Sequence, residues 1–443
     1  MSQAENSADL LLTGSYLYLQ DKDKTIIKDG GVAILRDTIV ETGTASDLAE
    51  KYPDAERLDT QNGLIMPGLI NTHTHAAMTS FRGLADDLPL MQWLQGYIFP
   101  LETKLTGDMV YQATLLSLAE MIKSGTTTFC DMYLFARDVA RATEESGMRA
   151  WIGEVFYDFP SPNYGKIADG LHYFKELTAM YQSHPLINIT VDPHAIYTCS
   201  PDLLIKLKKM ADTHDALYII HLAENEEEVK GSQELYGASP VMHLENLGIL
   251  DSRVVAVHCV ILTDEEIDLL AQRGVRVAHC PESNMKLASG IAPVPRMLAA
   301  GLSVGLGTDG SASNNNEDMF GEMNSAAKLH KAAALNPTIM SAETVLAMAT
   351  LHGASVLGAA NEIGSLEPGK KADIIVLDLD QPHLTPFFNI PSLLVYAARG
   401  ADVVHSIING RIVMRNRQIL TLDEKMILGS IRTMADQLKS TAA

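Results

Sequence analysis

Cysteine is scarce in this sequence, and the cysteines present are far apart. The 443 residues include four of them, Cys130, Cys199, Cys259 and Cys280, and no C-x-x-C pair. This pattern indicates neither a disulfide framework nor a cysteine-based zinc site. Any metal site must therefore be built from histidine, aspartate or glutamate.

Basic residues are also few: 34 lysines and arginines stand against 55 aspartates and glutamates, for a formal net charge of -21. Because phosphate binding needs clustered Lys and Arg, this charge argues against nucleic acid and anionic membrane as partners. The sequence also lacks an apolar run of membrane-spanning length, and its start, MSQAENSADLLL, lacks the basic region that precedes a secretory core. We therefore expect a cytoplasmic protein.

The composition is that of a folded globular protein, with 47% hydrophobic and 20% charged residues. The chain is longer than a single hydrophobic core usually requires, although barrel domains of about 250 residues or more are ordinary. We expect one large domain and a smaller companion.

The two chain ends share a pattern of short alternating strands separated by Gly and Asp. The N-terminal segments are DLLLTGSYLYL, GGVAILRDTIVETG and ERLDTQNGLIM, and the C-terminal ones are KKADIIVLDL and VHSIINGRIVMRNRQIL. This similarity predicts a small composite β-sandwich formed by residues 1–66 together with residues 369–443, the latter also carrying a terminal helix.

Residues 67–368 instead repeat an apolar strand followed by an amphipathic helix. The first clear helix, TGDMVYQATLLSLAEMIKSG, has Thr106 as a predicted N-cap and Gly125 just past its end. Eight such units predict an α/β fold, a (β/α)8 TIM-type barrel. The strands are predicted at GLINTH, TTTFCDM, RAWIGEVF, NITVDPH, LYIIHLA, VVAVHC, VRVAHCP and LSVGLGTDG.

A titratable residue lies at the end of every predicted strand. Because active sites of such barrels lie at the carboxyl ends of the strands, we expect these side chains to point into one mouth. Strands also end in polar residues simply because they end near water, but that reading explains poorly why six of the 14 histidines fall there. In strand order the residues are His73 and His75, Asp131, Glu154, His194, His221, His258, His279 and Asp309.

His73 and His75 are two residues apart, so both can face the same side of a strand. A third imidazole, His221 in HLAEN, and a carboxylate, Asp309 in GLGTDG, would complete a set of nitrogen and oxygen donors. Such a set suits one divalent first-row ion, zinc in the first place, with iron as the alternative.

The motifs PGLINTHTH, HLAEN, VHC, HCPESNMKLASG and GTDGSASNN occur in this order along the chain. Together they resemble the amidohydrolase superfamily and, within it, the branch of 5-methylthioadenosine and S-adenosylhomocysteine deaminases. The resemblance covers essentially the whole chain, including the composite sandwich. It implies a hydrolytic deaminase that converts a purine nucleoside to the inosine form with release of ammonia.

The resemblance also implies a role for each candidate residue. Asp309 would take a proton from the attacking water through its free carboxylate oxygen and later deliver it to the leaving ammonia. Glu224 would protonate the ring nitrogen beside the amino-bearing carbon, and His258 would hydrogen-bond the attacking oxygen. A solvated acid in the run AENEEEV and a structural histidine are the alternatives. The implied metal ligands are His73, His75, His221 and Asp309, which would hold an ion that lowers the pKa of its water toward about 7.

The segment DLPLMQWLQGYIFPLETKL follows the first barrel strand and is expected to form a long loop over the mouth. By resemblance, Glu102 accepts the ribose hydroxyls, His194 contacts the nucleoside, and Trp93 packs against its thioether side. The alternatives are a helix-surface position for Glu102 and simple burial for Trp93.

Some members of the branch carry an arginine after the third barrel strand, which pairs with the homocysteine carboxylate. Here the region reads YDFPSPNYGKIADG, and Lys166 is its only cation. Lysine is a point charge without the bidentate fork of arginine. We therefore expect methylthioadenosine or adenosine to be favoured over S-adenosylhomocysteine.

Fold alone does not decide the reaction. The same scaffold hosts s-triazine chlorohydrolases and deaminases of guanine or cytosine, and a catalytically silent barrel is a further alternative. The complete donor set argues against a silent scaffold. The zinc deaminases with an H-x-E and P-C-x-x-C signature are excluded because that pattern is absent. The sequence leaves open the role of His279 and whether the chain forms a homo-oligomer.

Overall fold

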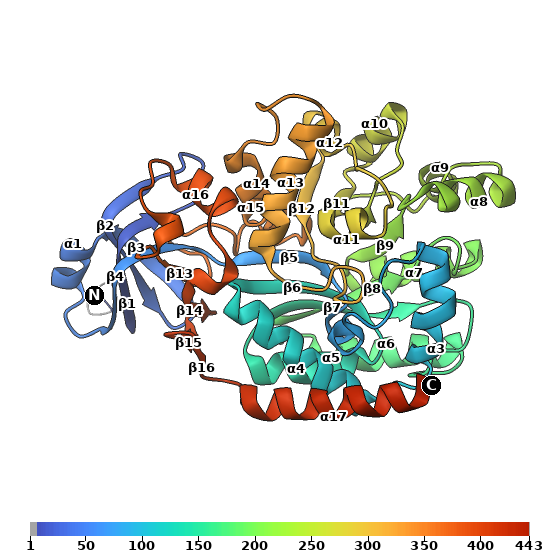
Figure 1. Cartoon of the computed structure of the whole chain (residues 1–443), viewed down its shortest axis with the longest axis horizontal. Coiled ribbons are helices and arrows are strands. Elements are labelled where there is room, and N and C mark those ends of the chain that lie inside the picture. The colour runs from blue at the N-terminus through green and yellow to red at the C-terminus, as the bar shows by residue number, and fades with distance from the viewer. Residues whose placement is uncertain (1–6, 443) are drawn as a thin grey trace.

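The computed structural model describes residues 7–442, and its strands form two eight-stranded sheets. We call them the end sheet (β1–β4 and β13–β16) and the barrel sheet (β5–β12). Figure 1 shows the end sheet at one side of the molecule and the barrel, surrounded by helices, filling the rest.

The barrel sheet contains eight parallel strands in sequence order. Its first and last strands meet, because the Thr72 hydroxyl donates to the carbonyl of Leu306 at 2.9 Å and the Asp309 N–H donates to the carbonyl of His73 at 3.0 Å. The predicted (β/α)8 barrel is confirmed. The strands are β5 (Leu69–Thr74), β6 (Thr126–Tyr133), β7 (Arg149–Phe156), β8 (Ile187–Pro193), β9 (Tyr218–Leu222), β10 (Val254–His258), β11 (Arg276–His279) and β12 (Ser303–Leu306).

The barrel helices follow local signals in the sequence. Helix α4 (Gly107–Lys123) begins after Thr106, whose hydroxyl accepts the N–H of Met109, and the chain leaves the helix through Gly125 at φ 87°. Both ends agree with the prediction. The barrel helices that follow β6 are α5 (Ala136–Ser146), α6 (Ile167–Tyr181), α7 (Pro201–His214), α8 (Glu226–Tyr236), α9 (Pro240–Asn246), α10 (Asp264–Arg273), α11 (Pro281–Lys286), α12 (Val294–Ala299), α13 (Met319–Ala333), α14 (Ala342–Met348) and α15 (Leu351–Val356).

The end sheet draws strands from both chain ends, as predicted. Its order is β16-β15-β14-β13-β4-β1-β2-β3, so the two halves join where β4 pairs antiparallel with β13. Helix α1 (Ala45–Lys51) follows the third strand. The strands are β1 (Leu10–Tyr18), β2 (Ile26–Leu35), β3 (Thr38–Thr44), β4 (Glu56–Pro67), β13 (Ile374–Asp378), β14 (Val403–Ile408), β15 (Arg411–Arg415) and β16 (Gln418–Ile419).

The end sheet encloses a hydrophobic cluster separate from that of the barrel. Leu12 and Val32 from the N-terminal strands meet Val376 and Ile407 from the C-terminal strands in this cluster. The edge at β3 also reaches the other half, because the N–H of Ile39 donates to the carbonyl of Lys370 at 2.8 Å. Burying one face of each half against the other is the principle of a sandwich. The division of the chain into residues 1–66, 67–368 and 369–443 stays a prediction.

One buried ion pair joins the barrel to the end sheet. Arg149 begins β7, and its guanidinium contacts both carboxylate oxygens of Asp373, at 2.7 and 3.2 Å, just before β13. The side chain of Asn409 accepts a further bond from Arg149 at 3.1 Å. Both charged side chains are less than 5% exposed. A bidentate pair in this position fixes how the two sheets are placed.

We expect Arg149→Met to lower the free energy of unfolding by about 3 to 5 kcal/mol, because Asp373 would keep a buried charge without its partner. Urea denaturation measures the change. Arg273→Met is the control: Arg273 pairs with Glu245 on the surface, and its loss should cost at most about 1 kcal/mol. Equal effects of the two substitutions would contradict the role given to Arg149.

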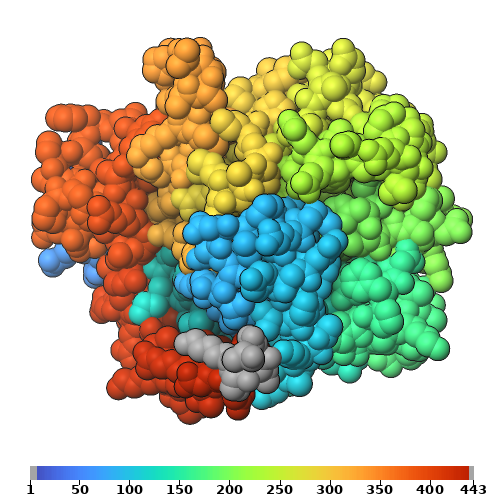
Figure 2. All heavy atoms as spheres, turned by 45° about the vertical axis from the view of Figure 1, so that its right-hand side comes forward, coloured from blue at the N-terminus to red at the C-terminus, as the bar shows by residue number. Residues whose placement is uncertain are grey.

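The segment after the first barrel strand is helical rather than a loop, so that prediction is wrong. After η1 (Ala76–Phe81), residues 87–105, the cover segment, contain α2 (Leu90–Trp93), the π-helical η2 (Leu94–Ile98) and α3 (Phe99–Glu102). Its buried apolar residues, Leu90, Trp93, Leu94 and Ile98, recur at helical spacing. Pro89 and Pro100 stand at the starts of α2 and α3, where proline is tolerated. Figure 2 shows the segment, in light blue, lying across the middle of one face.

The C-terminal part ends in a helix, as predicted. After η3 (Pro382–Leu384), α16 (Ile390–Tyr396) and η4 (Gly400–Asp402), α17 (Glu424–Ala442) runs along the barrel beneath α4 and α5 (Figure 1). Lys123 of α4 pairs with Glu424 of α17 at 2.7 Å. Among residues 7–442, no helix has both the length and the apolar character needed to cross a membrane.

Candidate active site

Two histidines at the end of the first barrel strand meet a third from the fifth. His73 lies in β5, His75 follows that strand directly, and His221 lies in β9. The ring centroid of His73 is 4.8 Å from that of His75 and 5.1 Å from that of His221. The two-residue spacing therefore brings both rings to one side, as predicted.

Asp309 faces this histidine cluster from the turn after β12. Its Oδ1 lies 3.2 Å from Nε2 of His75 and 3.5 Å from Nε2 of His73. Asp309 at φ 60° and His258 at φ 70° both have left-handed backbone conformations. Residues other than glycine rarely adopt them, and such strained positions are concentrated at functional sites.

Backbone carbonyls orient two of the three imidazoles. Nδ1–H of His75 donates to the carbonyl of Met132, and Nδ1–H of His221 donates to the carbonyl of His194 at 2.7 Å. Because Nδ1 carries the proton, Nε2 of each ring presents a lone pair toward the cluster. His73 is fully buried, and neither of its ring nitrogens has a hydrogen-bond partner among the described residues.

These donors fit a metal ion. One ligand atom each from His73, His75 and His221 lies within 4.8 Å of the others, and the same holds for His73, His258 and Asp309. Buried polar atoms without a partner are rare in native proteins, so the orphaned nitrogens of His73 call for a cation. Imidazole nitrogens with one carboxylate oxygen form a donor set typical of first-row divalent ions.

The pKa shifts of His73, His221 and Asp309 agree with this interpretation. Burial lowers the pKa of His73 to about 4 and holds that of His221 well below its usual value, so both rings are neutral at pH 7. Burial opposes ionisation of Asp309 as well, but the neighbouring imidazoles of His73 and His75 keep its pKa well below the usual value. His75 differs: burial opposes its charged form, but hydrogen bonding to Asp309 raises its pKa to about 9, so a bound metal ion would displace that proton. A neutral imidazole and a charged carboxylate are the forms that bind metal.

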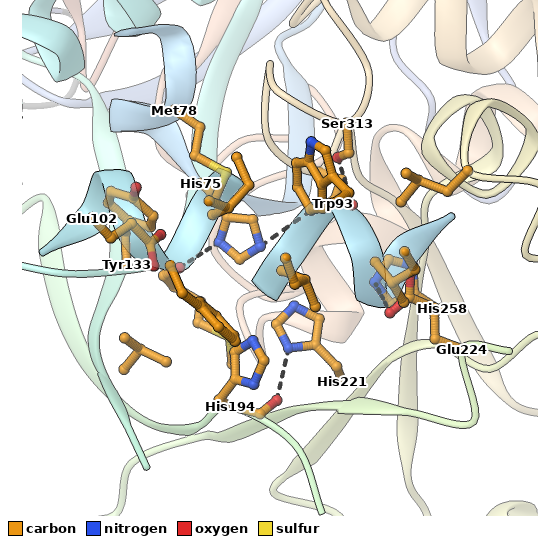
Figure 3. Close-up of a pocket in the computed structure, with 18 of the residues that line it drawn as sticks. His75, Met78, Trp93, Glu102, Tyr133, His194, His221, Glu224, His258 and Ser313 are labelled. Atoms are coloured by element: carbon orange, nitrogen blue, oxygen red, sulfur yellow. Dashed lines mark hydrogen bonds and ion pairs between the residues drawn. The ribbon is translucent and has the colours of Figure 1, made fainter. Parts of the chain in front are cut away.

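A cavity of about 60 Å³ opens beside the cluster, and the cover segment forms one of its walls. Figure 3 shows Trp93 of that segment over the imidazoles, Glu102 at one side of them, and Glu224 with His258 at the other. All these side chains line the cavity. The site therefore has two different ends on either side of the histidine cluster.

Glu224 lies in the turn after β9 and is only 5% exposed. Its backbone N–H donates to Glu228 at 2.7 Å, which holds the turn. Burial raises the pKa of Glu224, and its Oε2 lies 3.9 Å from Nε2 of His258. A solvated acid is therefore the wrong reading of this residue, and the side chain is an acid that keeps its proton closer to neutral pH.

The other end of the cavity holds the predicted substrate contacts. Glu102 is buried, which raises its pKa to about 7, so it does not sit on a helix surface facing solvent. The ring of His194 lines the same cavity, and its Nδ1 lies 2.9 Å from the hydroxyl of Thr198. Trp93 is 5% exposed and also lines the cavity, so burial and ligand contact are compatible there.

Three strand-end residues lie outside both the cavity and the histidine cluster, which corrects the expectation that all of them share one mouth. Asp131 and Glu154 accept backbone N–H bonds, at 2.6 and 2.8 Å, from the first residues of η1 and α5. His279 instead faces His330 of α13, with 3.3 Å between their Nε2 atoms. Side chains alternate along a strand, so a residue at or near its end can point away from the site. Lys166 is exposed and does not line the cavity.

Three polar residues without a predicted role also contact the site. Ser283 donates to Oδ2 of Asp309 at 2.6 Å and Ser313 donates to the same atom at 3.0 Å, so this carboxylate oxygen is not free as expected. The side chain of Asn284 contacts Nδ1 of His258 at 2.9 Å. These residues lie inside the motifs HCPESNMKLASG and GTDGSASNN. Their position in the motifs was the available signal, because serine and asparagine alone indicate no particular chemistry.

Comparison with known proteins gives a family match over most of the chain. The sequence profile of the amidohydrolase family matches residues 64–413. A 5-methylthioadenosine/S-adenosylhomocysteine deaminase of Syntrophobacter fumaroxidans is 54% identical over 432 residues, covering 98% of this chain and 99% of that protein. A 5'-deoxyadenosine deaminase of Methanosarcina barkeri is 43% identical and covers 97% of this chain and 98% of its own length.

A solved structure matches this fold over nearly the whole chain. The crystal structure of an adenosine deaminase from Xanthomonas campestris, with bound zinc, superimposes with a TM-score of 0.96 at 36% identity. The match covers 98% of this chain and 99% of the other. The fold of the barrel and of the end sheet is therefore shared with that protein.

Proposed function

This chain belongs to the amidohydrolase family, and on that basis we propose that it is a metal-dependent hydrolytic deaminase of adenine nucleosides, with 5-methylthioadenosine as its preferred substrate. The observation that carries the proposal is a cluster of three imidazoles and one carboxylate that adjoins the same cavity as Glu224, a buried acid outside that cluster. Similar proteins named as deaminases of adenine nucleosides support it over their whole length.

Zinc is the proposed ion, held by His73, His75, His221 and Asp309. A nitrogen-rich donor set suits zinc, and the similar Xanthomonas campestris structure contains it. When bound, the ion supplies Lewis acidity that lowers the pKa of a water molecule toward about 7. Iron is the alternative ion that the same donors can bind.

Glu224 and Asp309 carry out the proton transfers of the proposed reaction. Glu224, whose pKa is raised by burial, donates a proton to the ring nitrogen beside the amino-bearing carbon, which makes that carbon electrophilic. His258 hydrogen-bonds the attacking water through Nε2. Oδ2 of Asp309 takes one proton of that water and passes it to the leaving ammonia, and the second proton of the water returns to Glu224 as the carbonyl forms. Ser313 can release Oδ2 for this step, because its hydroxyl also lies 3.1 Å from the carbonyl of Gly310.

The two ends of the cavity give the nucleoside one orientation. The amino-bearing ring must lie near Glu224, His258 and Asp309, since these groups act on it. The ribose then extends toward Glu102 at the other end, whose carboxylate can accept two vicinal hydroxyls. His194 lies between the two ends (Figure 3).

The cover segment must move for a nucleoside to bind. A cavity of about 60 Å³ is far below the roughly 300 to 1,000 Å³ of ordinary ligand pockets. Leu90, Trp93 and Leu94 of the cover segment close it on one side. The segment is built from short helices rather than from a barrel strand, so it is the part of the wall that can shift without disturbing the metal ligands.

The space beyond Glu102 is suited to an uncharged 5' substituent. A second cavity of about 390 Å³ shares Phe99, Glu102 and Tyr157 with the first. The rings of Tyr157 and Phe159 stack in it at 3.9 Å. Among the described residues, no lysine or arginine lines either cavity, and Lys166 lies outside both. A homocysteine carboxylate would find no cationic partner here.

We expect zinc-loaded protein to turn over methylthioadenosine with a kcat/KM about 10- to 100-fold above that for S-adenosylhomocysteine, with adenosine between them. Loss of adenine absorbance in parallel assays measures all three, and a chelator control tests the metal. An equal or higher kcat/KM for S-adenosylhomocysteine would contradict the preference. No turnover of any of the three would contradict the proposed function and favour guanine, cytosine or s-triazine substrates.

A further inference from the structure

Helix α11 occupies a particular place among the barrel strands. In the barrel sheet, β11 lies between β10, which ends at His258, and β12, which leads to Asp309. The last residue of β11, His279, points away toward α13. The chain then turns at once into α11 (Pro281–Lys286). This strand therefore contributes its following helix to the site, placed between two of the proposed catalytic groups.

The first of two adjacent residues in α11 contacts Asp309. The Ser283 hydroxyl is fully buried and donates to Oδ2 of Asp309 at 2.6 Å. A carboxylate oxygen has two lone pairs, and Ser313 uses the second one at 3.0 Å. When Ser313 turns to the carbonyl of Gly310, the bond from Ser283 leaves one lone pair on Oδ2 for the proton of the attacking water. It also turns Oδ1 toward His73 and His75. Ser283 thereby orients Asp309 so that Oδ2 can take a proton while Oδ1 faces His73 and His75.

The second residue contacts His258. Asn284 is 1% exposed, and its Oδ1 lies 2.9 Å from Nδ1 of His258. An amide oxygen only accepts, so Nδ1 of His258 carries a proton and Nε2 is presented to the cavity, 3.9 Å from Glu224. His258 has a left-handed backbone conformation. The contact with Asn284 therefore fixes the orientation of the His258 ring on a strained part of the backbone.

Helix α11 is also held in place by contacts other than those of Ser283 and Asn284. Ser325 of α13 donates to Glu282 at 2.7 Å, and Lys286 pairs with Asp86 at 2.7 Å. These contacts fasten the helix at its outer side, whereas Ser283 and Asn284 direct their side chains to Asp309 and His258. Neither residue lines the cavity. They act on the substrate only through the residues that they touch.

We propose that Ser283 and Asn284 are positioning residues, which let α11 set the orientation of Asp309 and His258 together for attack on the adenine ring. The inference rests on the proposed function, because it assigns those two groups their catalytic roles. Outer hydrogen-bond partners of this kind typically change activity by about 10- to 100-fold when removed.

The test compares Ser283→Ala, Asn284→Leu and Asn284→Asp with the wild type. Ser283→Ala and Asn284→Leu should each lower kcat by about 10- to 100-fold, with KM within about twofold, because the substrate loses no direct contact. Asn284→Asp should restore most of the activity, since a carboxylate also accepts from Nδ1–H. The control Ser325→Ala disturbs the packing of α11 alone and should leave kcat unchanged.

A double-mutant cycle separates positioning from general damage. In a His258→Gln background, Asn284→Leu should have little further effect on kcat, because its partner is already gone. Multiplying effects, or a Ser325→Ala variant as impaired as Ser283→Ala, would overturn the proposal. Crystal structures of Ser283→Ala and Asn284→Leu give a readout without turnover. Unmoved Asp309 and His258 side chains would overturn the proposal, whereas wild-type protein inactive on every nucleoside would refute only the proposed function.

Discussion

Asp309→Asn is expected to lower kcat/KM by about 10³- to 10⁴-fold, the largest effect of any substitution considered. The asparagine keeps the shape of the side chain but removes the negative charge that faces His73 and His75 at 3.5 and 3.2 Å. It also removes the oxygen that takes the proton of the attacking water. Steady-state kinetics and metal analysis of the purified variant measure the two losses separately.

A matched control for this substitution is Glu154→Gln. Glu154 is also a fully buried acid near the end of a barrel strand, and burial raises its pKa to about 8, so it is largely neutral at pH 7. Its amide replacement should therefore fold and react almost normally. Unchanged turnover by Asp309→Asn, with metal still bound, would show that Asp309 neither transfers a proton nor supplies a needed charge.

Glu224→Gln is expected to lower kcat by about 10²- to 10⁴-fold while the protein keeps its metal. Glutamine can donate a hydrogen bond to the ring nitrogen but cannot give it a proton. Burial raises the pKa of Glu224, so the protonated form that the reaction needs persists to higher pH than for an exposed glutamate. Activity of the wild type should accordingly fall as the pH rises through that pKa.

The variant and wild-type pH profiles of kcat test this role together. The alkaline limb assigned to Glu224 should disappear in Glu224→Gln. Glu226→Gln is the control, because Glu226 is exposed in the first turn of α8 and lines neither cavity. A Glu224→Gln variant with nearly normal kcat would mean that another group protonates the ring.

The elements of this fold could be predicted because their signals are local. The eight barrel strands are short apolar runs, and α4 carries its own start and stop in Thr106 and Gly125. For the cover segment the sequence predicts a loop, because its helical spacing is spread over three short helices, and that prediction is wrong. Its helices are stabilised by burial against the barrel mouth rather than by strong caps.

The candidate site was predictable as a set of residues but not as a set of contacts. His73, His75 and His221 could be grouped because strand ends of a parallel barrel meet at one face. The same argument placed Asp131, Glu154 and His279 there too, and it failed for them. Whether a strand-end side chain points inward depends on where the strand stops, to within one residue, and the sequence does not locate strand ends that well.

The sequence by itself determined the alternation of strands and helices, the absence of cysteine ligands and the residues able to hold a metal, since each depends on residue type and short spacing. Only the tertiary structure decided that β4 pairs with β13, that Arg149 meets Asp373, and that α11 contacts Asp309 and His258. These contacts join residues up to several hundred positions apart. Their geometry depends on how the whole barrel closes, which no local pattern encodes.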